Sequence, residues 1–212
     1  MLYNILLIIH IIAGSVALLG AVIAIYTKIV NGSHQWHIYG GLSFFYGMLF
    51  VFLTTIPMTI LKPNLFLFLI GIFSFYFAFM GWRMAVNRVG KAGIPEYTAM
   101  IIMSITSVVM IVWGGSLLWN DNGNGVTLII FGALGAMFSI SSMRQYQSGP
   151  IKGKERIGSH LGNMLGATIA AVTAVLVVNV DTDPVWLAWI APTVIITPLI
   201  FWMTNRVRKG KL

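Results

Sequence analysis

The sequence predicts an all-α integral membrane protein, a bundle of seven transmembrane helices with the N-terminus outside and the C-terminus in the cytoplasm. Of its 212 residues, 58% are hydrophobic and 8% are charged, whereas roughly a quarter of an average soluble domain is charged. The mean hydropathy is +0.89. Apolar runs of about 20 residues, the length that crosses a bilayer as a helix, recur along the whole chain. These observations exclude an ordinary soluble enzyme and a disordered chain.

Each of the seven apolar runs is bounded by turn-forming residues. The predicted spans are residues 2–25, 39–60, 65–86, 97–119, 126–143, 160–178 and 186–203. Gly, Pro, Asn and Ser are common between them, for example in segments 62–64 and 148–150, as expected for turns. Helices satisfy their own backbone hydrogen bonds, which lipid cannot do. We therefore expect a single transmembrane domain over residues 1–212.

The placement of charge predicts the orientation of the bundle. An outside N-terminus puts twelve of the 13 basic residues on the cytoplasmic side: Lys28, Arg83, Arg88, Lys91, Arg144, Lys152, Lys154, Arg156, Arg206, Arg208, Lys209 and Lys211. Lys62 falls outside, together with Asp121, Asp181 and Asp183. An excess of Lys and Arg marks cytoplasmic loops, so the net charge of +8 indicates topology and not nucleic-acid binding. The expected partners on the cytoplasmic side are anionic lipid headgroups.

Several classes of chemistry are excluded by missing residues. The chain has no cysteine, which excludes disulfides, thiolate metal sites and a cysteine nucleophile. The seventh span has no lysine for a retinal Schiff base, and neither a Gly-x-Ser-x-Gly elbow nor a Walker loop occurs. Whether the protein is an enzyme is left open by the sequence.

The four histidines, His10, His34, His37 and His160, are the candidate functional residues. Ionisable residues in spans are costly and often functional. His10, His37 and His160 each head a stripe of small residues, which predicts that they face other helices and not lipid. The structural alternative is that each imidazole only bonds to a neighbouring backbone. His37 and His160 lie at cytoplasmic helix ends and can meet, whereas His10 is roughly 25 Å from that end of its span.

A transition-metal site is the first functional hypothesis. His37 and His160 are its central ligands, and His34 and Glu96 are the supporting candidates. Imidazole and carboxylate together suit Zn, Fe, Cu or Ni, and the spacing does not choose among these metals.

A b-type haem is the second form of the same hypothesis. Haem needs one or two axial ligands at matching depth, which His37 and His160 supply, with Met164 one turn further along. Arg83 and Arg144 are candidates to pair with the haem propionates through charge-assisted hydrogen bonds. The role of such a site is one-electron transfer at the membrane.

The competing hypothesis is a small-solute or proton-coupled transporter, or a non-catalytic membrane partner subunit, with a homo-oligomer as a further option. In the transporter, His10 is a proton relay, since histidine titrates near neutral pH. A polar path then leads to His37 or His160 through hydroxyl groups, for which the candidates are Thr54, Ser104, Ser107, Ser139 and Ser142.

Three motifs also resemble a known family. They are residues 10–20 (HIIAGSVALLG), residues 37–40 (HIYG) and residues 156–164 (RIGSHLGNM). Together they resemble the prokaryotic predicted membrane protein family called domain of unknown function 2306, over nearly the full chain. The resemblance implies a multi-pass bacterial inner-membrane protein and adds no activity.

Overall fold

The computed structural model describes residues 1–30 and 32–210, and it is built from helices. The helices are α1 (Leu2–Ile29), α2 (His34–Leu61), α3 (Leu65–Val86), α4 (Ile94–Trp119), α5 (Asn124–Gln147), α6 (Gly153–Asn179) and α7 (Trp186–Arg208). All seven are long and apolar enough to cross a membrane. The predicted seven-helix bundle is therefore confirmed, while the orientation of that bundle stays a prediction.

The helices continue beyond the predicted spans at the end that carries the basic residues. α2 begins at His34 and α6 begins at Gly153, five and seven residues before the expected starts at residues 39 and 160. The added turns are polar, so hydropathy does not detect them, although their residues are compatible with a helix. As a result, His160 lies about two turns inside α6 and not at its beginning.

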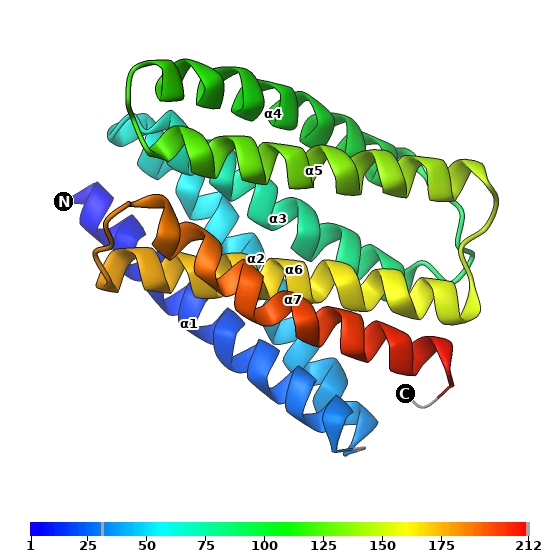
Figure 1. The fold of residues 1–212 in the computed structure, drawn as a ribbon. Coiled ribbons are helices and arrows are strands. Elements are labelled where there is room, and N and C mark those ends of the chain that lie inside the picture. Colours follow the sequence, from blue (N-terminus) through cyan, green and yellow to red (C-terminus); the bar gives the residue numbers. More distant parts are fainter. Residues whose placement is uncertain (31, 211–212) are drawn as a thin grey trace.

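The seven helices form three groups (Figure 1). α1 and α2 are an inclined pair along one side of the molecule, α4 and α5 pair on the opposite side, and α3, α6 and α7 lie between them. α1 contacts α2 and α6, whereas α3 contacts α2, α4, α5 and α6. The two termini lie at opposite ends of the bundle (Figure 1), as an odd number of spans requires.

Glycines allow α1 and α2 to approach backbone to backbone. A Cβ atom added at Gly40 would lie 2.8 Å from the Ala24 nitrogen and 2.8 Å from the Gly20 oxygen. One added at Gly47 would lie 2.8 Å from the Ala13 oxygen. Small residues at helix crossings give this close packing in membrane proteins, and here it holds the start of α2 against the end of α1.

A second close crossing joins α3 and α6. A Cβ atom at Gly81 would lie 3.1 Å from the backbone nitrogen of Met164, and one at Gly166 would lie 3.0 Å from the Phe77 ring. The absence of a side chain at Gly81 thus leaves its carbonyl open to the turn of α6 that carries His160.

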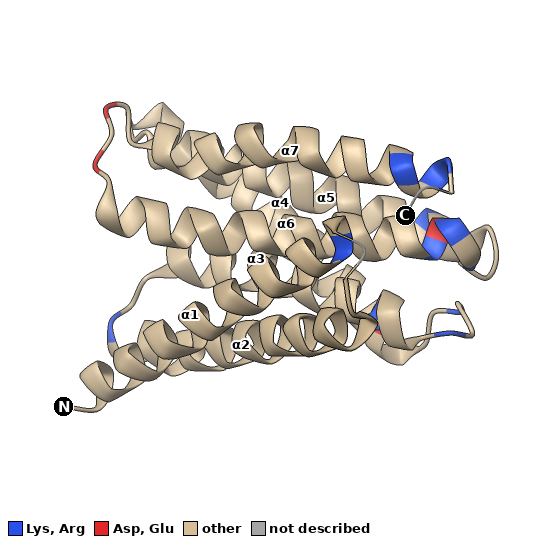
Figure 2. Cartoon of the chain, turned by 90° about the horizontal axis from the view of Figure 1, so that it is seen from below, with Lys and Arg blue, Asp and Glu red and all other residues tan. Residues whose placement is uncertain are grey.

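Lys and Arg gather at the end of the bundle that holds the C-terminus, and acidic residues lie in a loop at the opposite end (Figure 2). Eleven of the twelve basic residues predicted to be cytoplasmic lie in the described ranges, and Lys211 lies outside them. The loops at the basic end are joined, because the Ile151 N–H donates to the Gly90 oxygen at 2.9 Å. The basic residues therefore lie at one end of the bundle, where the α3–α4 and α5–α6 loops are hydrogen-bonded to each other.

Candidate functional site

His37 is held at the α1–α2 crossing. It lies in the first turns of α2, is half-buried, and its Nδ1 is 3.0 Å from the Ala24 carbonyl oxygen on α1. A carbonyl oxygen only accepts hydrogen bonds, so Nδ1 carries the hydrogen. In the neutral imidazole, Nε2 then keeps its lone pair.

His160 is held in the same way by a different helix. Its Nδ1 is 2.8 Å from the Gly81 carbonyl oxygen on α3, and the ring is also half-buried. The same reasoning assigns the hydrogen to Nδ1 and the lone pair to Nε2. None of the hydrogen bonds among the described residues uses Nε2 of either ring.

The two rings meet where α2 and α6 approach one another. Their centroids are 6.3 Å apart and their planes are at 76°. His34 also stacks on His37, with centroids 6.5 Å apart and planes at 20°, and it is exposed. The structure thus brings together three of the four histidines in one row.

Glu96, expected as a supporting metal ligand, has a different set of partners. It is fully buried at the start of α4, and its Oε1 accepts from Arg83 Nε at 2.7 Å and from Asn87 Nδ2 at 3.0 Å. Its Oε2 accepts from the Gly93 N–H at 2.9 Å. Within residues 1–30 and 32–210, no group of three or more His, Asp or Glu side chains could hold a metal ion as they stand.

The three residues expected to help bind a haem lie in different places: Met164, Arg83 and Arg144. Met164 packs on Gly81, directly behind the carbonyl that binds His160. Arg83 is engaged by Glu96, and Arg144 is exposed in the last turn of α5.

His10 lies at the opposite end of the α1–α2 crossing. Its Nδ1 is 2.9 Å from Thr54 Oγ1 on α2. The Thr54 hydroxyl is also 2.8 Å from the Phe50 oxygen, so it donates to the backbone and accepts from His10. Of the hydroxyls proposed as a path, Thr54 is therefore bonded to His10, whereas Ser104 and Ser139 bond to each other at 3.1 Å between α4 and α5.

Sequence reasoning missed the cations beside the histidines. The positive charges of Lys28 and Arg156 act on His160, and Arg156 Nη1 donates to the Met84 carbonyl at 3.2 Å. Arg156 is one turn before His160 on α6, and that spacing was the available signal. The carbonyls of Ala24 and Gly81, which orient the rings, could not be predicted, because every residue type has a backbone carbonyl.

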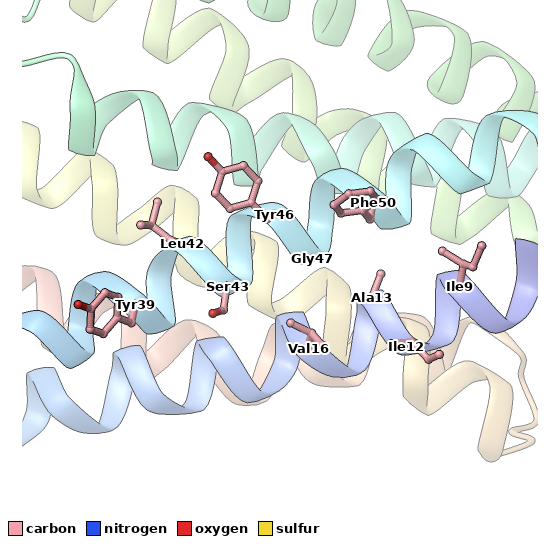
Figure 3. Close-up of a pocket in the computed structure, with 10 residues that line it drawn as sticks. All are labelled: Ile9, Ile12, Ala13, Val16, Tyr39, Leu42, Ser43, Tyr46, Gly47 and Phe50. Atoms are coloured by element: carbon pink, nitrogen blue, oxygen red, sulfur yellow. The ribbon is translucent and has the colours of Figure 1, made fainter.

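A small cavity adjoins the row of histidines. It has a volume of about 200 Å³ and is lined by Thr27, Lys28, Gly32, His34 and His37. A larger groove of about 560 Å³ runs between α1 and α2 on the outer face of the pair (Figure 3). Its lining is apolar except for one serine and two tyrosines: Ile9, Ile12, Ala13, Val16, Tyr39, Leu42, Ser43, Tyr46, Gly47 and Phe50. The ionisable chemistry therefore lies at the small cavity and not in the larger groove.

The fold defines a multi-pass membrane protein, and the histidine row at its basic end is the candidate site. No protein-family model, curated protein or solved structure matches the chain. The resemblance to the family called domain of unknown function 2306 accordingly stays a prediction.

Proposed function

We propose that this protein binds a transition-metal ion through Nε2 of His37 and Nε2 of His160, near the cytoplasmic face of the bacterial inner membrane. The observation that carries the proposal is the pair of Nδ1–carbonyl bonds, 3.0 and 2.8 Å long, which orient both rings. Metal-binding histidines usually donate their other N–H to a carbonyl or carboxylate in this manner.

The separation of the rings suits a shared ion. Two imidazoles with metal–nitrogen bonds of about 2.0 Å hold their ring centres about 5 Å apart at a tetrahedral angle and about 6.3 Å apart in a linear arrangement. The measured separation is 6.3 Å, so a tetrahedral ion requires the two rings to move about 1 Å closer together. Two imidazoles leave further positions open for exogenous ligands. Exposed His34 stacks on His37 and can supply a third nitrogen after a side-chain rotation.

A bare ion fits the surroundings better than a haem. Pockets for cofactor-sized ligands have volumes of about 300–1,000 Å³, and the cavity at the histidines is about 200 Å³. Gly81 and Met164 are in contact beside His160, and Arg83, the expected propionate partner, pairs with Glu96. Copper is the first metal to test, because imidazole sites bind it most tightly among the divalent ions of this row and it supports one-electron transfer.

The test is a copper and zinc titration of the purified protein in detergent, with metal analysis and, for copper, electron paramagnetic resonance. We expect one ion per chain, and a loss of affinity of at least about 100-fold in His37→Ala and in His160→Ala. His10→Ala is the matched control, since it removes an equally half-buried imidazole with a bonded Nδ1. Unchanged stoichiometry in the His37→Ala, His160→Ala double variant would falsify the proposal.

The orientation of the site also needs a test. Because the native chain has no cysteine, single cysteines report the side on which they lie. We expect Lys209→Cys to react with an impermeant maleimide only after the cells are opened, and Asn122→Cys to react in intact cells. Labelling of both from the same side would contradict the proposed topology.

A proton-coupled transporter has less support. His10 and His37 lie at opposite ends of the α1–α2 crossing, and the contacts between them are backbone to backbone at Gly20, Gly40 and Gly47. A proton relay needs a chain of hydrogen-bonding groups, which this apolar crossing does not offer. Proton flux in liposomes that is lost in His10→Ala would favour the transporter over the metal site.

A further inference from the structure

We propose that the 200 Å³ cavity in the turn between α1 and α2 binds a phosphoryl group, either of a lipid headgroup or of a soluble phosphate. The cavity is lined by Thr27, Lys28, Gly32, His34 and His37. One ammonium and two imidazoles thus surround a space large enough for a small anion with some water. The proposal goes beyond metal binding and does not depend on it.

The cavity has an excess of positive charge. Lys28 lines the cavity, and Arg156 lies one turn before His160 on α6, whose ring is adjacent to that of His37 in the cavity lining. In the described part of the chain the one ion pair joins Arg83 to Glu96. These cations accordingly have no carboxylate to offset their mutual repulsion, and a bound anion would provide that charge.

The remaining carboxylate at this end of the bundle is also engaged. Glu155 Oε1 accepts from Gln145 Nε2 at 2.8 Å, on the α5–α6 side of the molecule. Since Glu96 is buried against Arg83, neither inner carboxylate serves the cavity. Within residues 1–30 and 32–210, no side-chain carboxylate is therefore paired with Lys28 or Arg156, and a bound anion would supply the counter-charge.

The chemistry of the lining favours phosphate over a weaker anion. Lysine is a common phosphate ligand as a point charge, and Lys28 lines the cavity. Backbone N–H groups in the first turn of α2 add to this, because the N-cap Ser33 makes no side-chain capping bond and the turn contains no acidic residue. The cavity lies at the basic end of the bundle, where lipid phosphates are found if the bundle has the proposed orientation.

The anion also bears on the metal. Two nearby cations disfavour a positive ion at His160 by Coulomb repulsion, and a phosphoryl group beside Lys28 would offset that repulsion. Its oxygen could also occupy an open position of the metal. We therefore expect phosphate and metal to strengthen each other's binding, as linkage requires of two coupled sites.

The experiment measures phosphate binding to EDTA-treated protein in a phosphate-free maltoside detergent, by calorimetry. Native mass spectrometry of the same protein with phosphatidylglycerol measures lipid binding. The test variant is Lys28→Gln. Lys91→Gln is the matched control, because it removes an exposed lysine at the same end of the bundle. We expect affinity for inorganic phosphate, lipid or both to fall about tenfold in Lys28→Gln, the loss expected for one charge-assisted hydrogen bond, and to stay unchanged in Lys91→Gln.

The two arms identify the source of the anion. A loss confined to phosphatidylglycerol adducts indicates a lipid headgroup, and a loss confined to inorganic phosphate indicates a soluble ligand. Equal binding by Lys28→Gln and Lys91→Gln in both arms would overturn the proposal. If the metal-binding proposal is wrong, the result is different: the protein then binds no metal, while its binding of phosphate still depends on Lys28.

Discussion

His10 and His37 lie at the two ends of one helix crossing, and the groups around the two rings are different. Each uses Nδ1 to bond across the α1–α2 interface, and His10 is roughly 21 Å along α1 from Ala24, the partner of His37. His10 bonds to a hydroxyl whose hydrogen is already donated to the Phe50 carbonyl, and His37 bonds to a carbonyl, so both partners accept and Nδ1 carries the hydrogen in each ring. The difference is that His37 has a second imidazole, His160, with ring centroids 6.3 Å apart. The comparison therefore teaches that the neighbours of an imidazole, and not its Nδ1 bond, distinguish the candidate site from the other end of the crossing.

The wider surroundings of the two histidines also differ. The basic end, which holds His37, contains a second imidazole at 6.3 Å, two nearby cations and a buried ion pair. At the other end, His10 has one neutral partner that is itself bonded to the backbone of α2. We expect the basic end to contribute more to stability, and three substitutions test this difference.

The largest effect is expected from Glu96→Gln at the basic end. Breaking a buried ion pair on one side leaves an unpaired charge and costs about 3 kcal/mol, and Glu96 also accepts from Asn87 and Gly93. The measurement is the free energy of unfolding in detergent, followed by circular dichroism. Glu155→Gln is the control, because exposed Glu155 accepts one side-chain bond, and its change should stay within about 0.5 kcal/mol. Equal losses in the two variants would remove the assigned role of the buried pair.

An intermediate effect is expected from Gly40→Ala at the His37 end of the crossing. The new Cβ would meet backbone atoms of Ala24 and Gly20 at 2.8 Å, so the helices must separate at a cost of about 1–3 kcal/mol. The separation also moves Ala24 away from His37, and metal affinity should fall with stability. Gly41→Ala is the control, because nothing lies within 4 Å of its new Cβ.

In contrast to Gly40→Ala, Gly41→Ala should stabilise the helix by up to about 1 kcal/mol, as alanine is the better helix former. The sign of the two changes is therefore opposite at adjacent positions. If both variants changed stability in the same direction, the close approach of α1 and α2 would not be supported.

The smallest effect is expected from Thr54→Val at the His10 end. The change removes the acceptor of His10 with little change of volume and costs about 1 kcal/mol, the net worth of one neutral hydrogen bond. Metal and phosphate binding should be unaffected, because both sites lie at the other end of the crossing. A change of metal affinity in Thr54→Val, measured by the same titration as for His37→Ala, would show that the two ends are coupled.

The seven helices could be predicted from local patterns. Hydropathy over about 20 residues and the turn residues between runs depend on neighbours in sequence, so the count of helices needed no tertiary information. The ends of the helices could be predicted less well. The polar turns that open α2 and α6 at His34 and Gly153 extend past the apolar run, and hydropathy alone could not place them.

Part of the site could also be predicted. His37 and His160 lie at a similar depth at one end of the bundle, which predicted that the two rings meet. The structure places the ring centroids 6.3 Å apart. Depth in the membrane could not exclude Arg83 and Glu96 from the site, because both residues lie at the same end of the bundle. Their pairing follows from the short α3–α4 connection, which returns the chain so that the two side chains meet at 2.7 Å.

By itself, the sequence determined that this is a chain of seven apolar helices with its basic residues at one end, because composition, periodicity and turn chemistry are local properties. Only the tertiary structure decided which histidines are oriented and which carbonyls orient them. Those contacts depend on the rotation and crossing of helices that are distant in sequence. Gly40 sets the approach of α2 to Ala24 and Gly81 that of α6 to α3, and neither distance can be read from one helix alone.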